Sequence, residues 1–182
     1  MSYQSIWYKT KLPKYVIDSF IEETKNIDVS QSTIKDNVLN VRTRNSKTCW
    51  IPQSHWIGGF ATHYVMQANQ FNFGYDLVKT PDRPLQYTSY DEGEYYNWHV
   101  DTIDEVETGI VRKLSFTIQL SAPEDYSGGE LQFLDDGNNT FFAPKERGTI
   151  IVFDSRMRHR VRKIRDGSRK SIVGWVEGPA WK

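Results

Sequence analysis

The chain has 182 residues, of which 38% are apolar, 25% charged and 14% aromatic. This length predicts a single domain, and the aromatic content excludes a disordered chain. The 23 basic and 23 acidic side chains cancel, which argues against general electrostatic binding to nucleic acid or to anionic membranes, and the single cysteine excludes an internal disulfide.

The sequence contains no segment typical of membrane insertion or export. No apolar run approaches the roughly 20 residues that cross a bilayer. The first residues, Met1 to Tyr8, lack the basic start and the apolar stretch of a signal peptide. We therefore expect a cytoplasmic protein without a membrane partner.

Two amphipathic helices are predicted in the first half of the chain. After Pro13, apolar residues recur at helical spacing over Val16–Thr24. A second apolar stripe begins near Ser54 and runs over Ile57–Ala68. Such helices would cover one face of a sheet that the rest of the chain forms.

The second half of the chain is predicted to consist of short strands. In Leu114–Leu120 apolar and polar residues alternate without interruption, which is the period of a half-buried strand. The other expected strands are Gln86–Tyr90, Tyr96–Asp101, Glu130–Leu134, Thr140–Phe142, Thr149–Phe153, His159–Ile164 and Lys170–Val176. Many short strands at nearly regular spacing favour a β-sandwich or barrel. We therefore predict one mainly-β domain over residues 1–182, with helical support in 1–84 and a β core in 85–178.

Histidine is scarce, and two of the four histidines stand out. His99 and Asp101 are two residues apart in a strand-like segment, so their side chains would project from one face. His159 alternates with the arginines of Arg156–Arg162, so the arginines would face water and His159 the interior. Two imidazoles and a carboxylate form the facial triad of non-haem Fe(II) oxygenases. Three such ligands also suit catalytic zinc, and a buried histidine can be purely structural.

Arg169 helps to discriminate between these alternatives. It follows His159 by ten positions and would share the inward face of a strand with Ser171, Val173 and Trp175. A buried arginine is costly unless it pairs with an anion, and its planar donor fork fits a carboxylate. The partner is either an acidic side chain of the protein or the carboxylate of a bound molecule.

Five segments of the sequence resemble, in their order along the chain, the Fe(II)/2-oxoglutarate-dependent dioxygenases. The resemblance is closest to the prolyl-4-hydroxylase-like branch of that family. They lie between Gln86 and Trp175, about half of the chain. The segments are Tyr90–Asp101, Arg112–Ser121, Asp125–Phe133, His159–Val161 and Gly167–Arg169. The resemblance implies that the catalytic core is a double-stranded β-helix, a jelly-roll barrel, with the N-terminal helices packed on one sheet.

The resemblance also implies a metal, cosubstrates and a reaction. His99, Asp101 and His159 would hold Fe(II), and Arg169 would pair with the distal carboxylate of 2-oxoglutarate. The enzyme would hydroxylate an unactivated C–H bond, consuming O₂ and converting 2-oxoglutarate to succinate and CO₂. Ascorbate could be required as well.

Four further side chains are assigned by the same resemblance. Tyr90, Thr117 and Gln119 would add contacts to 2-oxoglutarate, and Tyr96 would line the pocket near the iron. Many prolyl-4-hydroxylases carry Lys where Arg169 stands, so this arginine places the chain nearer the Arg-bearing bacterial hydroxylases.

The substrate stays open at this point. A prolyl residue in a peptide or protein is the predicted substrate, and a small molecule is an alternative. The basic series Arg156–Lys170 raises another alternative, an oxidative demethylase of nucleic acid that uses the same machinery. A jelly-roll binding module without enzymatic activity is a further alternative. The acidic segment Asp101–Glu107 is expected to form a loop that closes over the substrate.

Overall fold

The computed structural model describes residues 6–9, 12–25, 30–31, 42–52, 54–78, 83–102, 104–105 and 109–181. The N-terminal elements are β1 (Ile6–Lys9), α1 (Lys14–Lys25), β2 (Ser30–Gln31), β3 (Arg44–Asn45), β4 (Lys47–Ile51), α2 (Trp56–Ala68) and the π-helical turn η2 (Asn69–Phe73). The remaining elements are β5 (Leu85–Tyr90), β6 (Tyr95–His99), β7 (Asp104–Glu105), β8 (Ile110–Gln119), η3 (Pro123–Asp125), β9 (Tyr126–Gly128), β10 (Leu131–Leu134), β11 (Thr140–Phe142), β12 (Ile150–Asp154), β13 (Arg158–Val161), β14 (Ile164–Gly167) and β15 (Arg169–Pro179).

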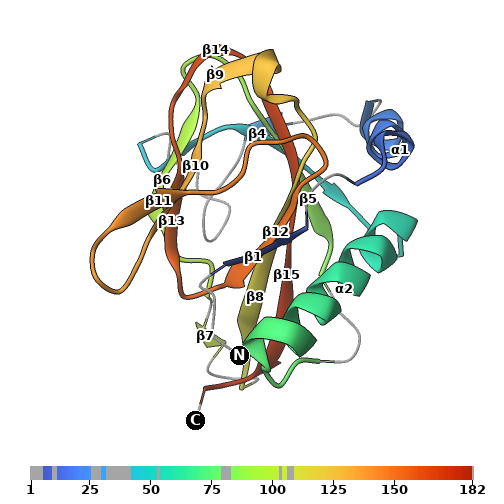
Figure 1. The fold of residues 1–182 in the computed structure, drawn as a ribbon, viewed down its shortest axis with the longest axis vertical. Helices are drawn as coiled ribbons and strands as arrows, with labels where there is room; N and C mark the ends of the chain where they lie inside the picture. Colours follow the sequence, from blue (N-terminus) through green and yellow to red (C-terminus); the bar gives the residue numbers. More distant parts are fainter. Residues whose placement is uncertain are drawn as a thin grey trace.

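Two antiparallel sheets make up most of the molecule (Figure 1). The larger sheet has the strand order β1-β12-β8-β15-β5-β4-β2, with β7 paired to β8. The smaller sheet has the order β11-β10-β13-β6-β3, and β9 pairs separately with β14. Strands far apart in sequence are neighbours in both sheets, as the predicted jelly roll requires. Among the described residues, strand pairing does not join the two sheets into a closed barrel.

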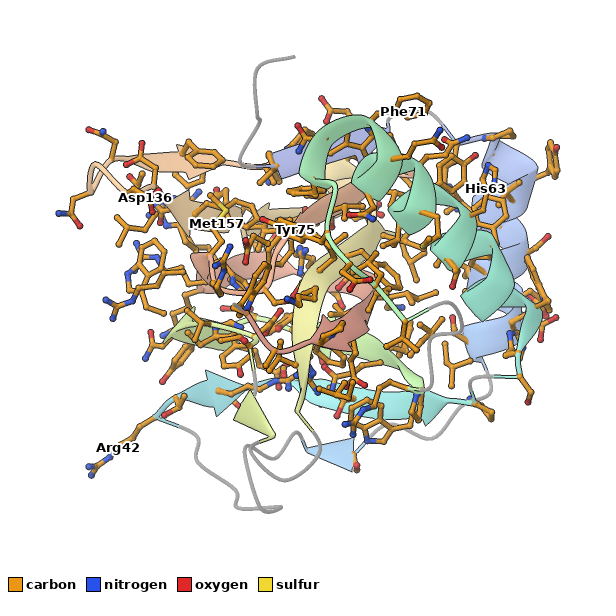
Figure 2. All side chains as sticks on the ribbon, turned by 90° about the horizontal axis from the view of Figure 1, so that it is seen from below. Arg42, His63, Phe71, Tyr75, Asp136 and Met157 are labelled. Carbon is orange, nitrogen blue, oxygen red and sulfur yellow. The ribbon has the colours of Figure 1, made fainter. Side chains whose placement is uncertain are left out.

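Both helices pack on one face of the larger sheet, as Figures 1 and 2 show. Along β8 the alternating residues Leu114, Phe116 and Ile118 are buried in one cluster with Phe20 of α1 and Ile57 of α2. Phe20 also contacts the rings of two residues at the start of α2, at centroid distances of 5.2 and 5.3 Å. The helices therefore cover the apolar face of the sheet, which confirms the predicted arrangement. In the part of the chain that the structure describes, no helix is long and apolar enough to cross a membrane.

The other face of the larger sheet points toward the smaller sheet and carries a different set of side chains. On β8 the intervening residues Ser115, Thr117 and Gln119 are buried and polar. Phe133 of β10, in the smaller sheet, and Phe153 of β12, on the strand beside β8, belong to a second apolar cluster between the sheets. The space between the two sheets is thus polar along β8 and apolar beside it.

Most of the predicted helices and strands are present in the structure, but the bounds of several strands differ. The two helices are present, but the predicted strand over 159–164 is divided between β13 and β14. The predicted strand over 96–101 ends at His99, because the amides of Asp101 and Thr102 both donate to the carbonyl of Ser155 instead of to a neighbouring strand.

Residues 1–84 are not helical support alone, contrary to the division that was predicted. They contribute β1, which pairs with β12, and β4, which pairs with β5, so both strands extend the larger sheet. Their sequences do not alternate between apolar and polar residues, so no period of two marks them as strands.

Asp154 ties the segment after α2 to the end of β12. Its carboxylate accepts a hydrogen bond of 2.6 Å from the Tyr75 hydroxyl and others from the backbone and guanidinium of Arg156. Burial opposes the charged form of Asp154, but these donors outweigh burial, and the pKa of Asp154 lies below its ordinary value.

We expect Asp154→Asn to destabilise the protein by about 1–3 kcal/mol near pH 7, because three donors lose a charged acceptor. A depressed carboxyl pKa contributes stability that is present above pH 3.8 and is lost as the pH falls through the folded-state pKa. The difference between wild type and variant in urea-measured unfolding free energy should therefore shrink below pH 3.8. A difference independent of pH would contradict this role.

Phe20→Ala should cost about 3–5 kcal/mol of unfolding free energy, because it removes a fully buried ring between the two helices and the sheet. Tyr15→Ala is the matched control on the same helix, since Tyr15 is 72% exposed, and it should change stability by less than about 0.5 kcal/mol. Urea unfolding measures both, and equal losses would show that the helix layer is not held as described.

Candidate active site

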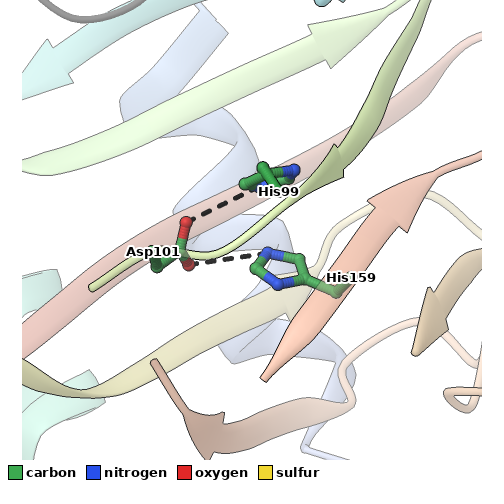
Figure 3. Close-up of side chains that lie close together, drawn as sticks. All are labelled: His99, Asp101 and His159. Atoms are coloured by element: carbon green, nitrogen blue, oxygen red, sulfur yellow. Dashed lines mark ion pairs between the residues drawn. The ribbon is translucent and has the colours of Figure 1, made fainter. Parts of the chain in front are cut away.

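Three side chains converge between the sheets, as Figure 3 shows. His99 is the last residue of β6, Asp101 follows two residues later, and His159 lies in β13. The Asp101 Oδ1 atom is 3.5 Å from His99 Nε2, and its Oδ2 atom is 3.5 Å from His159 Nε2. Their potential ligand atoms all lie within 4.8 Å of one another, which is close enough to bind one metal ion.

The backbone orients both imidazoles in the same way. His99 Nδ1 lies 2.7 Å from the carbonyl oxygen of Asn97, and His159 Nδ1 lies 2.9 Å from that of Met157. A carbonyl can only accept, so each Nδ1 carries the proton and donates it. Each Nε2 is then left with a lone pair that points toward Asp101, which is the arrangement typical of metal-binding histidines.

Burial and the neighbouring side chains set the charges of His99 and Asp101. Burial, followed by the neighbouring His159, lowers the pKa of His99 to about 3, so its imidazole is neutral over the physiological range. Burial alone would raise the pKa of Asp101, but the two histidines and the donor groups of Ser115 and Trp175 outweigh it, and the pKa of Asp101 falls below its ordinary value. Neutral imidazoles and an ionised carboxylate are the forms that bind a metal ion.

A β-bulge places Tyr96 against His99. His159 pairs with His99, whereas Val161 pairs with Tyr96, so β6 carries one extra residue between the two pairs. Simple alternation would put residues three apart on opposite faces. The extra residue brings both rings to the same side, where they stack with centroids 3.6 Å apart. Tyr96 thus lies beside the triad, where the resemblance had placed it.

Arg169 lies at the start of β15 and is only 2% exposed. Its guanidinium donates a hydrogen bond of 3.0 Å to Gln119 Oε1 and lies 5.8 Å from the centre of the Tyr90 ring, on the strand paired with it. No Asp or Glu among the described residues forms an ion pair with it, so an internal salt bridge does not explain its burial. Tyr126 of β9 is a further neighbour: burial raises the pKa of its phenol, and Arg169 opposes that shift.

The polar atoms between the triad and Arg169 lack partners. Thr117 Oγ1 and Ser171 Oγ are buried and make no hydrogen bond within the described structure. Both belong to the inner-facing residues of β8 and β15, which pair with each other in register. Unsatisfied buried donors and acceptors cost free energy, so their concentration here indicates the site of a polar ligand. The residues present therefore fit a metal ion together with a small carboxylate.

The structure brings most of the predicted site residues into two groups. His99, Asp101, His159 and Tyr96 form one, and Arg169, Gln119 and Tyr90 form the other. Thr117 lies on the same inner face, and its hydroxyl makes no hydrogen bond within the described structure. Of the acidic loop expected over 101–107, residues 103, 106 and 107 lie outside the described residues, so its closing role stays a prediction.

Sequence reasoning missed several neighbours of the site. The carbonyl of Ser155 anchors the backbone of Asp101, and the Ser155 hydroxyl shares a hydrogen bond of 2.9 Å with Ser115. Two more arginines, Arg44 and Arg112, lie close to the triad. None of these residues carries a local pattern that distinguishes it, because each is brought to the site by strand pairing over long sequence distances.

This combination defines a class of protein. Two sheets that enclose two histidines and one aspartate, with a buried arginine nearby, are the arrangement of a metal-dependent jelly-roll oxygenase. The family model of the 2OG-Fe(II) oxygenase superfamily matches residues 85–177. The chain belongs to this superfamily, whose members use Fe(II), 2-oxoglutarate and O₂.

The individual proteins to which the chain is similar in sequence are PKHD-type hydroxylases. It is 33% identical over 119 residues to a PKHD-type hydroxylase of Idiomarina loihiensis, which covers 64% of this chain and 53% of that protein. It is 40% identical over 94 residues to a PKHD-type hydroxylase of Acaryochloris marina, covering 51% and 41%. The chain thus spans about half the length of these relatives.

Solved structures show the same fold at low sequence identity. A prolyl hydroxylase from Trichoplax adhaerens, solved in complex with a hypoxia inducible factor peptide, has a TM-score of 0.78 at 17% identity, covering 94% of this chain and 83% of that one. A prolyl-4-hydroxylase of Pseudomonas putida has a TM-score of 0.74 at 16% identity, covering 97% and 94%. These likenesses support the jelly-roll assignment.

We expect His99→Ala to weaken Fe(II) binding at least about 100-fold under anaerobic conditions, because it removes one of three ligands. His63→Ala is the matched control, since His63 is an exposed residue on α2 and lies away from Met157 (Figure 2). Elemental analysis after gel filtration measures how much iron each of the two variants retains. Full iron retention in folded His99→Ala would remove His99 from the ligand set.

Proposed function

We propose that this chain forms one catalytic domain, a 2-oxoglutarate-dependent hydroxylase that acts on a prolyl residue of a peptide or protein. The observation that carries the proposal is the burial of the triad and of Arg169 between the two sheets, together with nearby buried polar atoms that make no hydrogen bond. Membership of the superfamily and the similarity to PKHD-type hydroxylases support it.

Each group would have a separate task. His99, Asp101 and His159 would hold Fe(II), which supplies oxygen activation when bound. Arg169 would bind the distal carboxylate of 2-oxoglutarate through its planar donor fork, with Gln119 fixing the guanidinium. A hydrolytic zinc site gives no reason for Arg169, because a hydrolase needs no dicarboxylate cosubstrate.

The overall reaction balances without another reactant. The substrate C–H bond, O₂ and 2-oxoglutarate give a C–OH group, succinate and CO₂: one oxygen atom enters the product and the other enters succinate. The surrounding side chains would keep water away during this reaction. Phe153 and Phe133 contact the His159 ring at 4.7 and 5.8 Å and form part of that apolar wall.

The prolyl substrate is supported by the relatives rather than by a bound molecule. PKHD-type hydroxylases are the curated relatives, and prolyl hydroxylases share the fold. We expect the purified protein, given Fe(II), 2-oxoglutarate and O₂, to add 16 mass units to prolyl residues in a peptide panel, with succinate formed in equal amount. Reactions run with and without ascorbate test that requirement. Succinate formation that no prolyl peptide stimulates would contradict the substrate assignment but not the cosubstrate assignment.

Arg169→Ala should raise the 2-oxoglutarate concentration for half-maximal succinate formation by at least about 30-fold, because loss of a buried charge partner costs about 2 kcal/mol or more. The control is Arg165→Ala on the neighbouring strand β14, where the side chain is exposed. The variant's iron content should equal that of the wild type. An unchanged 2-oxoglutarate requirement in Arg169→Ala would show that this arginine has another role.

A further inference from the structure

Arg44 is a second buried arginine near the triad, and its burial is not explained by the contacts that it makes. It is 7% exposed and donates to two neutral acceptors, Ser46 Oγ and Gln86 Oε1, both at 2.9 Å. No Asp or Glu forms an ion pair with it among the described residues. These two bonds leave three of its five N–H groups without an acceptor among the described residues. A buried guanidinium with neutral partners alone is costly, which points to an anion that completes the site.

The location of Arg44 links it to the metal site. Its guanidinium carbon lies 4.8 Å from the centre of the Tyr96 ring, and Tyr96 stacks directly on His99. Arg44 belongs to β3 of the smaller sheet, whereas Gln86 lies on the inner face of β5 in the larger sheet. The arginine therefore spans the gap between the sheets, one aromatic ring away from a metal ligand.

Arg112 flanks the same region from the larger sheet. Its guanidinium carbon lies 4.0 Å from the centre of the Trp175 ring, and one of its amino groups lies 3.4 Å from the Asp101 carbonyl oxygen. The Arg112 Nε atom is buried without a hydrogen-bond partner in the described structure. One donor of this guanidinium thus lacks an acceptor close to the backbone of a metal ligand.

Both arginines lie between the sheets at a distance from Arg169 along β15. On β15, Trp175 is six residues from Arg169, roughly 20 Å along a strand, and Gln86 is in register with Val173. A five-carbon dicarboxylate bound between Arg169 and the metal does not extend past the metal. An anion held by Arg44 and Arg112 would therefore belong to the substrate and not to the cosubstrate.

We propose that Arg44 and Arg112 bind a carboxylate of the peptide substrate next to the prolyl residue that is hydroxylated. This inference rests on the proposed function and adds a requirement on its substrate. The carboxylate has two sources, an acidic side chain adjacent to the proline or the C-terminal carboxylate of a chain that ends in proline. Both offer the same planar acceptor to a guanidinium.

Matched peptides test the requirement and separate the two sources. One pair places Glu or Gln beside a central proline, and the other ends in proline with a free carboxylate or a carboxamide. Calorimetric titration of the metal-free protein should show at least tenfold tighter binding of the charged member in one of the pairs. The pair that shows the preference identifies the source. A ratio near one in both pairs would overturn the proposal.

Variants test whether the arginines cause the preference. In Arg44→Gln the ratio should fall below about twofold, while affinity for the neutral peptide changes little. Arg44→Lys keeps the charge and should retain part of the ratio, which a structural tie between the sheets would not explain. Arg158→Gln, an outward residue of β13, should leave the ratio intact. An equal ratio in wild type and Arg44→Gln would overturn the assignment.

Iron-dependent succinate formation, measured in parallel, separates this inference from the proposed function. If the wild-type protein forms succinate but does not prefer the charged peptides, only the carboxylate site is contradicted. No succinate formation under any condition contradicts the hydroxylase itself.

Discussion

The pairing of β13 with β6 is the constraint on which the site depends. It sets His159 opposite His99, and the chain then leaves β6 so that Asp101 reaches both imidazoles. A register shift of one residue would exchange the inward histidine for an outward arginine, because side chains alternate along a strand. The apolar residues next to His159 that face the same side, with Val161 buried, make that shift costly.

The two faces of the larger sheet serve different purposes, one for stability and the other for ligand binding. Its outer face is apolar and packs against α1 and α2, which supplies much of the stability. Its inner face carries buried polar side chains, several without partners, which lowers stability but prepares a site for a polar ligand. The helices therefore compensate for an interior that is adapted to binding, and they do so without contributing a residue to the triad.

Strand alternation allowed the central residues to be predicted from the sequence. His159 among alternating arginines, His99 two residues from Asp101, and the inward Arg169 all follow from a period of two. Tyr96 does not, because the bulge in β6 reverses its side, and only the family resemblance placed it correctly. Arg44 could not be found, since it lies in a two-residue strand and reaches the site through a contact 42 residues away.

The central claim is that the triad and Arg169 together bind Fe(II) and 2-oxoglutarate, and an anaerobic visible spectrum tests it most directly. Fe(II) followed by 2-oxoglutarate, added to the metal-free protein, should produce a weak charge-transfer band that requires both additions. The band should be absent in His99→Ala and should need more 2-oxoglutarate in Arg169→Ala. A protein that retains no iron and gives no band would contradict the assignment of this site as an oxygenase centre.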